Sequence, residues 1–168
     1  MYWSKDVKNL LFDFRSDINY VIWVILSILK VFNCNNKKNS FKDYQKISFV
    51  IQLMHDSENM DSFIRLINGQ QLNVYEAHKL SSCYFSSKIE ERTINSALII
   101  LDKKKIINFH PTKERVNVYC DRIQDYNIMN GYKDVLEVLL SSKRELYYIK
   151  YNEILKKINN FKVEDINA

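Results

Sequence analysis

The histidine and cysteine side chains are the first candidates for metal or nucleophilic chemistry in this sequence. The three histidines, His55, His78 and His110, show no spacing typical of a metal-binding motif. His78 and Cys83 are separated by a step of five residues, which places them on different faces of a helix. The sequence therefore favours neither a metal centre nor a catalytic Cys–His pair.

The carboxylates and glycines indicate no catalytic site either. Glu90 and Glu91 are neighbours, and adjacent side chains on a helix point about 100° apart, so they cannot meet at one substrate atom. The sequence contains no HExxH, GxSxG or GxxxxGK[ST] motif. Both glycines, Gly69 and Gly131, follow an asparagine, which leaves none for a phosphate-binding loop. We expect a protein that is not an enzyme, with no cofactor, no metal and no small-molecule substrate.

Length and composition indicate one domain-sized unit with a substantial core. The chain has 168 residues, of which 46% are hydrophobic, and a net charge of +5. This mild excess is compatible with anionic partners without requiring them. The three cysteines are far apart and form no CxxC pair, which favours a reduced, cytoplasmic protein. The most apolar run, residues 20–29, is shorter than the roughly 20 residues of a membrane span, so we expect no membrane contact.

The first segment, to about residue 58, has the pattern of helices. A helix over 18–32, with Ser16 as its N-cap, is apolar on most sides and must be covered by neighbouring elements or by another chain. A capping box over 40–43 predicts the start of a second helix, which continues to Met54. Asp61 is the expected cap of a short helix that ends before Asn68 and Gly69.

The middle segment carries the clearest pattern. Asn73 and Glu76 predict a helix over 74–85, and Ser87 with Glu90 predicts the start of a second helix. Two alternating segments, 107–109 and 116–118, flank a turn that contains the only proline and predict a β-hairpin. Helix, tight turn, capped helix and hairpin is the order of a winged helix-turn-helix. The alternative is a helical domain with an incidental hairpin.

The last segment predicts one long helix over residues 133–160. The complete expectation is a mainly α fold with a small β-hairpin: a winged helix-turn-helix-like domain with N-terminal helices and a long C-terminal helix. Its parts are an N-terminal helical part (1–58), a winged-helix-like part (59–123) and the C-terminal helix (124–168), in one compact unit.

The exposed side of the predicted second helix and the hairpin turn are the candidate surface for DNA. The side chains suited to base contacts lie on the helix, and those suited to phosphate contacts lie in the turn. Against DNA binding, Glu90 and Glu91 occupy the first turn of that helix, which lies nearest the DNA in helix-turn-helix proteins. The candidate DNA-binding residues are Arg92, Asn95, Ser96, Lys113 and Arg115.

A second candidate surface would bind protein. Residues that lie off the main stripe of the N-terminal helix, and the large amphipathic tyrosines of the C-terminal helix, are suited to an interface. Core packing is the alternative role for the tyrosines. The candidate partner-binding residues are Trp23, Val24, Tyr147, Tyr148 and Tyr151.

The order of these elements resembles a bacterial defence family. The apolar run 20–29, the segment 87–101 and the hairpin over 107–119 resemble the middle, accessory component of three-component ABC-ATPase anti-phage systems of the Lamassu type. The resemblance implies a non-catalytic adaptor that bridges an SMC-like ABC ATPase and an effector, often a nuclease. It implies protein–protein contacts and possible nonspecific contact with double-stranded DNA. It transfers no functional residue, because the family has no sharp motif.

Two other functions are compatible with the same sequence. A free-standing winged-helix DNA-binding transcriptional regulator would bind specific sequences at physiological salt. A small structural or phage-encoded interaction protein would share the fold and have unrelated partners. A neighbouring gene for an SMC-like ATPase would favour the accessory subunit.

Overall fold

The computed structural model describes residues 17–128 and 131–164, so the predicted cap Ser16 lies outside the described residues. The described part is mainly helical with one two-stranded antiparallel sheet, as predicted. In chain order, the elements are α2 (Ile18–Val31), α3 (Lys46–Leu53), α4 (Ser57–Ile67), α5 (Val74–Lys103), β1 (Asn108–Pro111), β2 (Val116–Tyr119), the short 3-10 helix η2 (Ile123–Asp125), α6 (Lys133–Leu140), α7 (Lys143–Tyr148) and α8 (Tyr151–Glu164).

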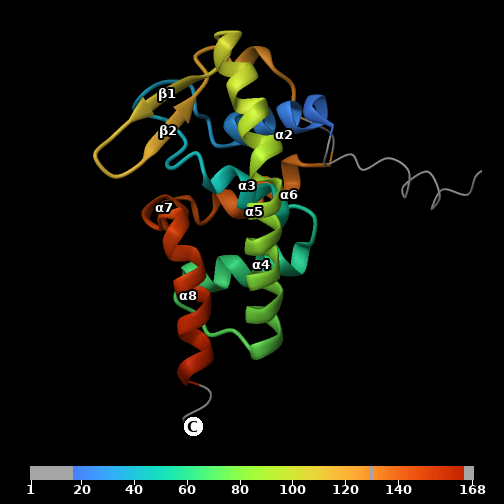
Figure 1. Ribbon diagram of the computed structural model, residues 1–168, viewed down its shortest axis with the longest axis vertical. Helices are drawn as coiled ribbons and strands as arrows, with labels where there is room; N and C mark the ends of the chain where they lie inside the picture. The colour runs from blue at the N-terminus through green and yellow to red at the C-terminus, as the bar shows by residue number, and fades with distance from the viewer. Residues whose placement is uncertain (1–16, 129–130, 165–168) are drawn as a thin grey trace, which may run out of the picture.

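Helix α5 is the element around which the others are arranged (Figure 1). Helices α2, α3, α4 and α8 all pack against it. One buried apolar cluster contains residues of all three predicted parts, such as Phe49, Leu98 and Ile154. The predicted boundary between residues 58 and 59 falls inside α4. Among the described residues, no helix has both the length and the apolar character needed to cross a membrane.

Aspartates cap helices α2 and α4. Asp17 accepts a hydrogen bond from the amide of Asn19 at 2.9 Å and caps α2. Asp56 caps α4 instead of the predicted Asp61, so α4 begins earlier than expected. The end of α4 is as predicted, because Gly69 adopts the left-handed φ of 78° that terminates a helix.

The first capping box of α5 is confirmed. The Asn73 side chain accepts from the amide of Glu76 at 2.8 Å, and the Glu76 carboxylate accepts from the amide of Asn73 at 2.9 Å. At the other end, Lys105 has a left-handed φ of 56°, and the amide of Ile106 donates back to the carbonyl of Leu101 at 2.9 Å.

The predicted second helix start at Ser87 is wrong. Its Oγ donates to the carbonyl of Tyr84 at 2.6 Å and lies 2.9 Å from the hydroxyl of Tyr151, so it does not cap an amide. Neither glycine nor proline occurs between residues 74 and 103 to stop the helix. The tight turn of a helix-turn-helix is thus replaced by one continuous helix, and a winged helix is not confirmed.

The single long C-terminal helix over 133–160 is also wrong, because the segment forms α6, α7 and α8. The chain breaks after α7 at Ile149, whose ψ of 133° is extended. There the carbonyls of Leu146 and Ile149 accept hydrogen bonds from the side chain of Lys46. The amide of Lys150, which would donate to the carbonyl of Leu146 in a continuous helix, donates instead to the carboxylate of Glu153 at 3.1 Å.

The predicted hairpin is confirmed. Strands β1 and β2 pair with Phe109 opposite Val118 and Pro111 opposite Val116. The backbone of Phe41 pairs with Val118 on the other edge of β2. The predicted helix start at 40–43 is therefore wrong, because that segment extends along β2 and α3 begins only at Lys46.

Candidate functional site

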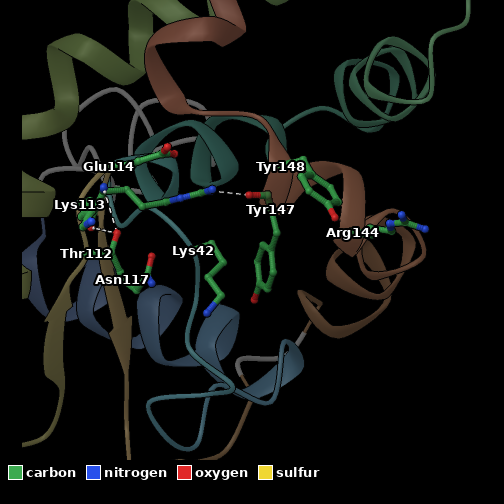
Figure 2. A pocket seen from close by; sticks show the side chains of 9 residues that line it. Lys42, Thr112, Lys113, Glu114, Asn117, Arg144, Tyr147 and Tyr148 are labelled. Carbon is green, nitrogen blue, oxygen red and sulfur yellow. Dashed lines mark hydrogen bonds between the residues drawn. The ribbon is translucent and has the colours of Figure 1, made fainter.

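A hollow of about 520 Å³ opens between the hairpin turn and α7, and we call it the cationic hollow. Figure 2 shows the turn residues on one side, the α7 side chains on the other, and Lys42 between them. Its lining comes from three segments that are distant in the sequence: Lys42, Thr112, Lys113, Glu114, Arg115, Asn117, Arg144, Tyr147 and Tyr148.

Positive charge dominates this lining. One carboxylate, Glu114, faces four cationic side chains: Lys42, Lys113, Arg115 and Arg144. Glu114 also forms an ion pair with Lys150 at 3.0 Å, and this hydrogen bond lowers the pKa of Glu114. An anion that enters the hollow would meet an excess of positive charge.

Arg115 connects the hairpin to α7. The turn is closed by the amide of Thr112, which donates to the carbonyl of Arg115 at 2.8 Å. The guanidinium of Arg115 then donates to the carbonyl of Tyr147. The half-buried arginine is thereby held at the wall of the hollow, and this contact uses one of its five N–H donors.

Lys42 is partly buried beside another cation, Arg115. Its Nζ donates to the hydroxyl of Ser40 at 3.1 Å. Partial burial and the neighbouring charge of Arg115 lower the pKa of Lys42. Because the cations of the hollow repel one another, a bound anion would relieve this repulsion.

The two tyrosines of the hollow have different environments. The ring of Tyr147 packs between Phe32 and Phe41, with centroids 6.0 and 5.6 Å away. Burial is the main cause that raises the pKa of Tyr147. Tyr148 is 70% exposed, and the guanidinium of Arg144 lies 5.7 Å from its ring centroid. The exposed rim therefore presents an aromatic ring beside a cation.

A buried lysine, which no sequence pattern indicated, lies beneath this surface. Lys46 is 0% exposed, and its Nζ donates to the carbonyls of Leu146 at 2.6 Å and Ile149 at 2.9 Å. Burial lowers the pKa of Lys46 to about 7, opposed by the charge of Asp43 and assisted by that of Arg115. All eight residues of α3 are buried, so an amphipathic pattern could not have identified Lys46.

Asp43 and Asn117 complete this buried polar cluster. The Asn117 side chain accepts from the amide of Asp43 at 3.1 Å, and the Asp43 carboxylate accepts from the amide of Tyr151 at 2.9 Å. Asp43 has a left-handed φ of 68°, which aspartate tolerates better than most residues. The cluster links β2, the segment before α3 and the start of α8, and so fixes the floor of the cationic hollow.

The structure separates the predicted DNA contacts. Lys113 and Arg115 meet in the cationic hollow. Arg92 and Ser96 lie on the exposed face of α5, where the Ser96 hydroxyl donates to the carbonyl of Arg92 at 3.0 Å. Asn95 lines a different, mainly apolar hollow beside Tyr44 and Phe109. The five residues are not gathered in one hollow.

The predicted partner-binding residues are also in different environments, some exposed and some buried. Trp23 and Tyr148 are exposed, and Tyr147 lines the cationic hollow. Val24 and Tyr151, at 1% and 2% exposed, are core residues, so their prediction as surface contacts is wrong. The faces of α2 and α8 that carry them pack inside the molecule.

Three of the histidine and cysteine side chains line a separate, shallow hollow of about 300 Å³. His55, His78 and Cys83 all contribute to its lining, although they are distant or poorly spaced in the sequence. Burial raises the pKa of the Cys83 thiol to about 12, which disfavours the nucleophilic thiolate. Within residues 17–128 and 131–164, no group of three or more His, Cys, Asp or Glu side chains has the arrangement to hold a metal ion.

Comparison with protein-family models, with curated proteins and with solved structures gives no match for this chain. The most distinctive surface feature described above is the cationic hollow with its exposed tyrosine.

Proposed function

We propose that this protein is a non-catalytic accessory subunit that acts by binding, and that the cationic hollow receives an acidic segment of a partner protein. The observation that carries the proposal is the set of four cationic side chains around one pocket, with Tyr148 exposed at its rim. Arginine and tyrosine are enriched among the residues that contribute most to protein interfaces.

A protein partner suits this geometry better than DNA does. Duplex DNA is bound by cations arranged along a stripe that follows the phosphates. Here the cations surround a pocket, while Arg92 lies on α5 and Asn95 lines another hollow. Contact with double-stranded DNA would accordingly be nonspecific and secondary.

The identity of the partner is proposed from the family resemblance alone. In that proposal the protein bridges an SMC-like ABC ATPase and an effector, such as a nuclease, in bacterial defence against phages and plasmids. ATP and DNA would change the conformation of the ATPase, and the contacts of this subunit with each conformation would restrain or release the effector. The apolar helix α2 and the hairpin support the resemblance, whereas residues 87–101 are part of the continuous α5.

The test is purification of the tagged full-length chain from its native host, followed by mass spectrometry. We expect an SMC-like ATPase to co-purify with the wild type and to be lost with the double variant Lys113→Glu/Arg144→Glu. Lys133→Glu/Lys156→Glu is the matched control, because it makes the same change in net charge at exposed positions away from the hollow. Equal recovery with both variants, or ATP hydrolysis or DNA cleavage by the purified chain alone, would contradict the proposal.

A free-standing DNA-binding transcriptional regulator is the alternative, and the exposure of Arg92 and Lys113 keeps it testable. It predicts specific duplex binding at physiological salt that is lost on Arg92→Ala. It also predicts a smaller salt dependence on Lys113→Ala, because one phosphate contact is removed. Fluorescence anisotropy with labelled duplexes separates this behaviour from the nonspecific binding expected of the accessory subunit.

A further inference from the structure

Helix α5 presents an exposed stripe whose apolar side chains none of the functions above uses. Four large apolar side chains on it are more than half exposed: Tyr75, Phe85, Ile89 and Ile99. Ile89, in the middle of the stripe, is 81% exposed. Exposed polar residues at 78, 82, 92 and 96 fill the gaps, so the steps along the stripe alternate between three and four residues. That alternation is the spacing of a coiled-coil seam.

Apolar and polar positions follow one another in the same order whether the stripe is followed from its N-terminal or its C-terminal end. Tyr75 and Ile99 are equally far from Ser87, and Phe85 and Ile89 are its inner apolar pair. Suppose that a second α5 packed antiparallel on the stripe, with the two-fold axis crossing the helix at the level of Ser87, between Phe85 and Ile89. Tyr75 would then face Ile99 of the second copy. Phe85 would likewise face Ile89 of the second copy. Apolar side chains would then meet only apolar side chains.

The polar positions are matched by the same two-fold axis. His78 and Ser96 are equally far from Ser87, as are Ser82 and Arg92. In the antiparallel arrangement Arg92 faces Ser82 of the second copy. In a parallel pair it would face Arg92 of the second copy, and two like charges would oppose association.

Charge at the two ends of α5 also favours the antiparallel arrangement. The end of α5 near Tyr75 has more carboxylates than cations. Its cations, Arg65 and Lys79, form ion pairs there, and its carboxylates are Asp56, Glu58, Asp61 and Glu76. The other end carries three exposed lysines at 103–105 beside Asp102. An antiparallel pair places each negative end against a positive end, and the helix dipoles are opposed.

We propose that the exposed stripe of α5 is the interface of a symmetric, antiparallel homodimer of this protein. The size of the stripe sets the expected affinity. A helix of 30 residues is about 45 Å long and about 10 Å wide, which gives a footprint of about 450 Å² on each copy. Stable interfaces bury about 800 Å² on each partner. The dimer is therefore weak, with a dissociation constant in the micromolar range.

Sedimentation velocity of the full-length chain over a micromolar concentration series tests the interface. We expect a reversible monomer–dimer equilibrium, which Ile89→Glu weakens more than about tenfold because it places two charges at the centre of the seam. Val138→Glu is the control, since Val138 is an exposed apolar residue on α6 and the substitution should leave the equilibrium unchanged. Circular dichroism establishes that both variants fold.

The register is tested by a charge at Ser82. Within one chain Ser82 and Arg92 are about 15 Å apart along the helix, too far to pair, but they are opposite each other in the dimer. Ser82→Glu should tighten the dimer about threefold to tenfold, and Ser82→Lys should weaken it. In an Arg92→Ala background Ser82→Glu should lose this gain.

Three results would overturn the proposal. A monomer at every concentration, or a dimer that Ile89→Glu does not weaken, excludes a second copy from the stripe. Identical effects of Ser82→Glu and Ser82→Lys exclude the antiparallel register.

Discussion

At the scale of single residues, the buried Lys46 is the group with the most unusual environment. A neutral amine has two N–H donors, and the carbonyls of Leu146 and Ile149 supply two acceptors. Both hydrogen bonds therefore persist when the proton is lost, while the cost of a buried charge disappears. This explains how a lysine is accommodated at a position with no exposed surface.

The first prediction is that stability rises with pH because of Lys46. The unfolded lysine keeps its proton up to its ordinary pKa of 10.5, whereas the folded one loses it near 7. Between these values the unfolded state binds more protons, so the free energy of unfolding increases with pH. We expect a gain of about 1–2 kcal/mol between about pH 6 and 8.5, measured by urea denaturation.

The pH series ends at about 8.5 because the buried thiols act in the opposite direction above that. Burial raises the pKa of Cys34 to about 11 and that of Cys83 to about 12, which makes the folded state less stable at high pH. Lys46→Met is the control. It should cost about 1–3 kcal/mol through the unpaired carbonyls and should abolish the rise. A rise that persists in this variant would show that another group causes it.

At the scale of the elements, local signals predicted some helix ends and failed at others, and distant contacts account for the failures at Ser87 and after α7. Asn73 with Glu76 and Ser87 with Glu90 have similar capping patterns, but only the first caps a helix. Ser87 bonds instead to Tyr151, which lies 64 residues further along the chain. A contact at that separation leaves no trace in a local pattern. The same holds for the break after α7, where the carbonyls of Leu146 and Ile149 accept from the distant Lys46 side chain.

The second prediction concerns the continuity of α5. Backbone amides at residues 86–90 belong to an uninterrupted helix, so their hydrogen exchange should be as slow as that of residues 80–84. The exposed hairpin turn at Lys113 and Glu114 serves as the fast-exchanging reference. Exchange measured by NMR would contradict the continuous helix if residues 86–90 exchanged as fast as that turn.

At the scale of the whole molecule, the candidate site shows what sequence patterns can locate. Lys113 and Arg115 were predicted as DNA contacts and Tyr148 as a partner contact, and the fold places all three in one hollow. Lys42 and Arg144 were missed, because neither has a local signal that distinguishes it from other surface cations. The sequence shows which residues carry suitable side chains. It does not show that they lie around one hollow, because that depends on the packing of three distant segments.

The last prediction is that an acidic peptide stabilises the folded protein by filling the cationic hollow. The cations there repel one another, and an anionic ligand relieves this repulsion. A ligand that binds only the folded state raises the free energy of unfolding of the protein by RT ln(1 + [L]/Kd). With a hexaglutamate peptide at about ten times its Kd, this amounts to about 1.4 kcal/mol, or a rise of about 3–6 °C in Tm. Lys113→Glu/Arg144→Glu should abolish the rise measured by calorimetry, and Lys133→Glu/Lys156→Glu should retain it. An equal rise in both variants would mean that the peptide responds to net charge, and the hollow would then have no special role in binding.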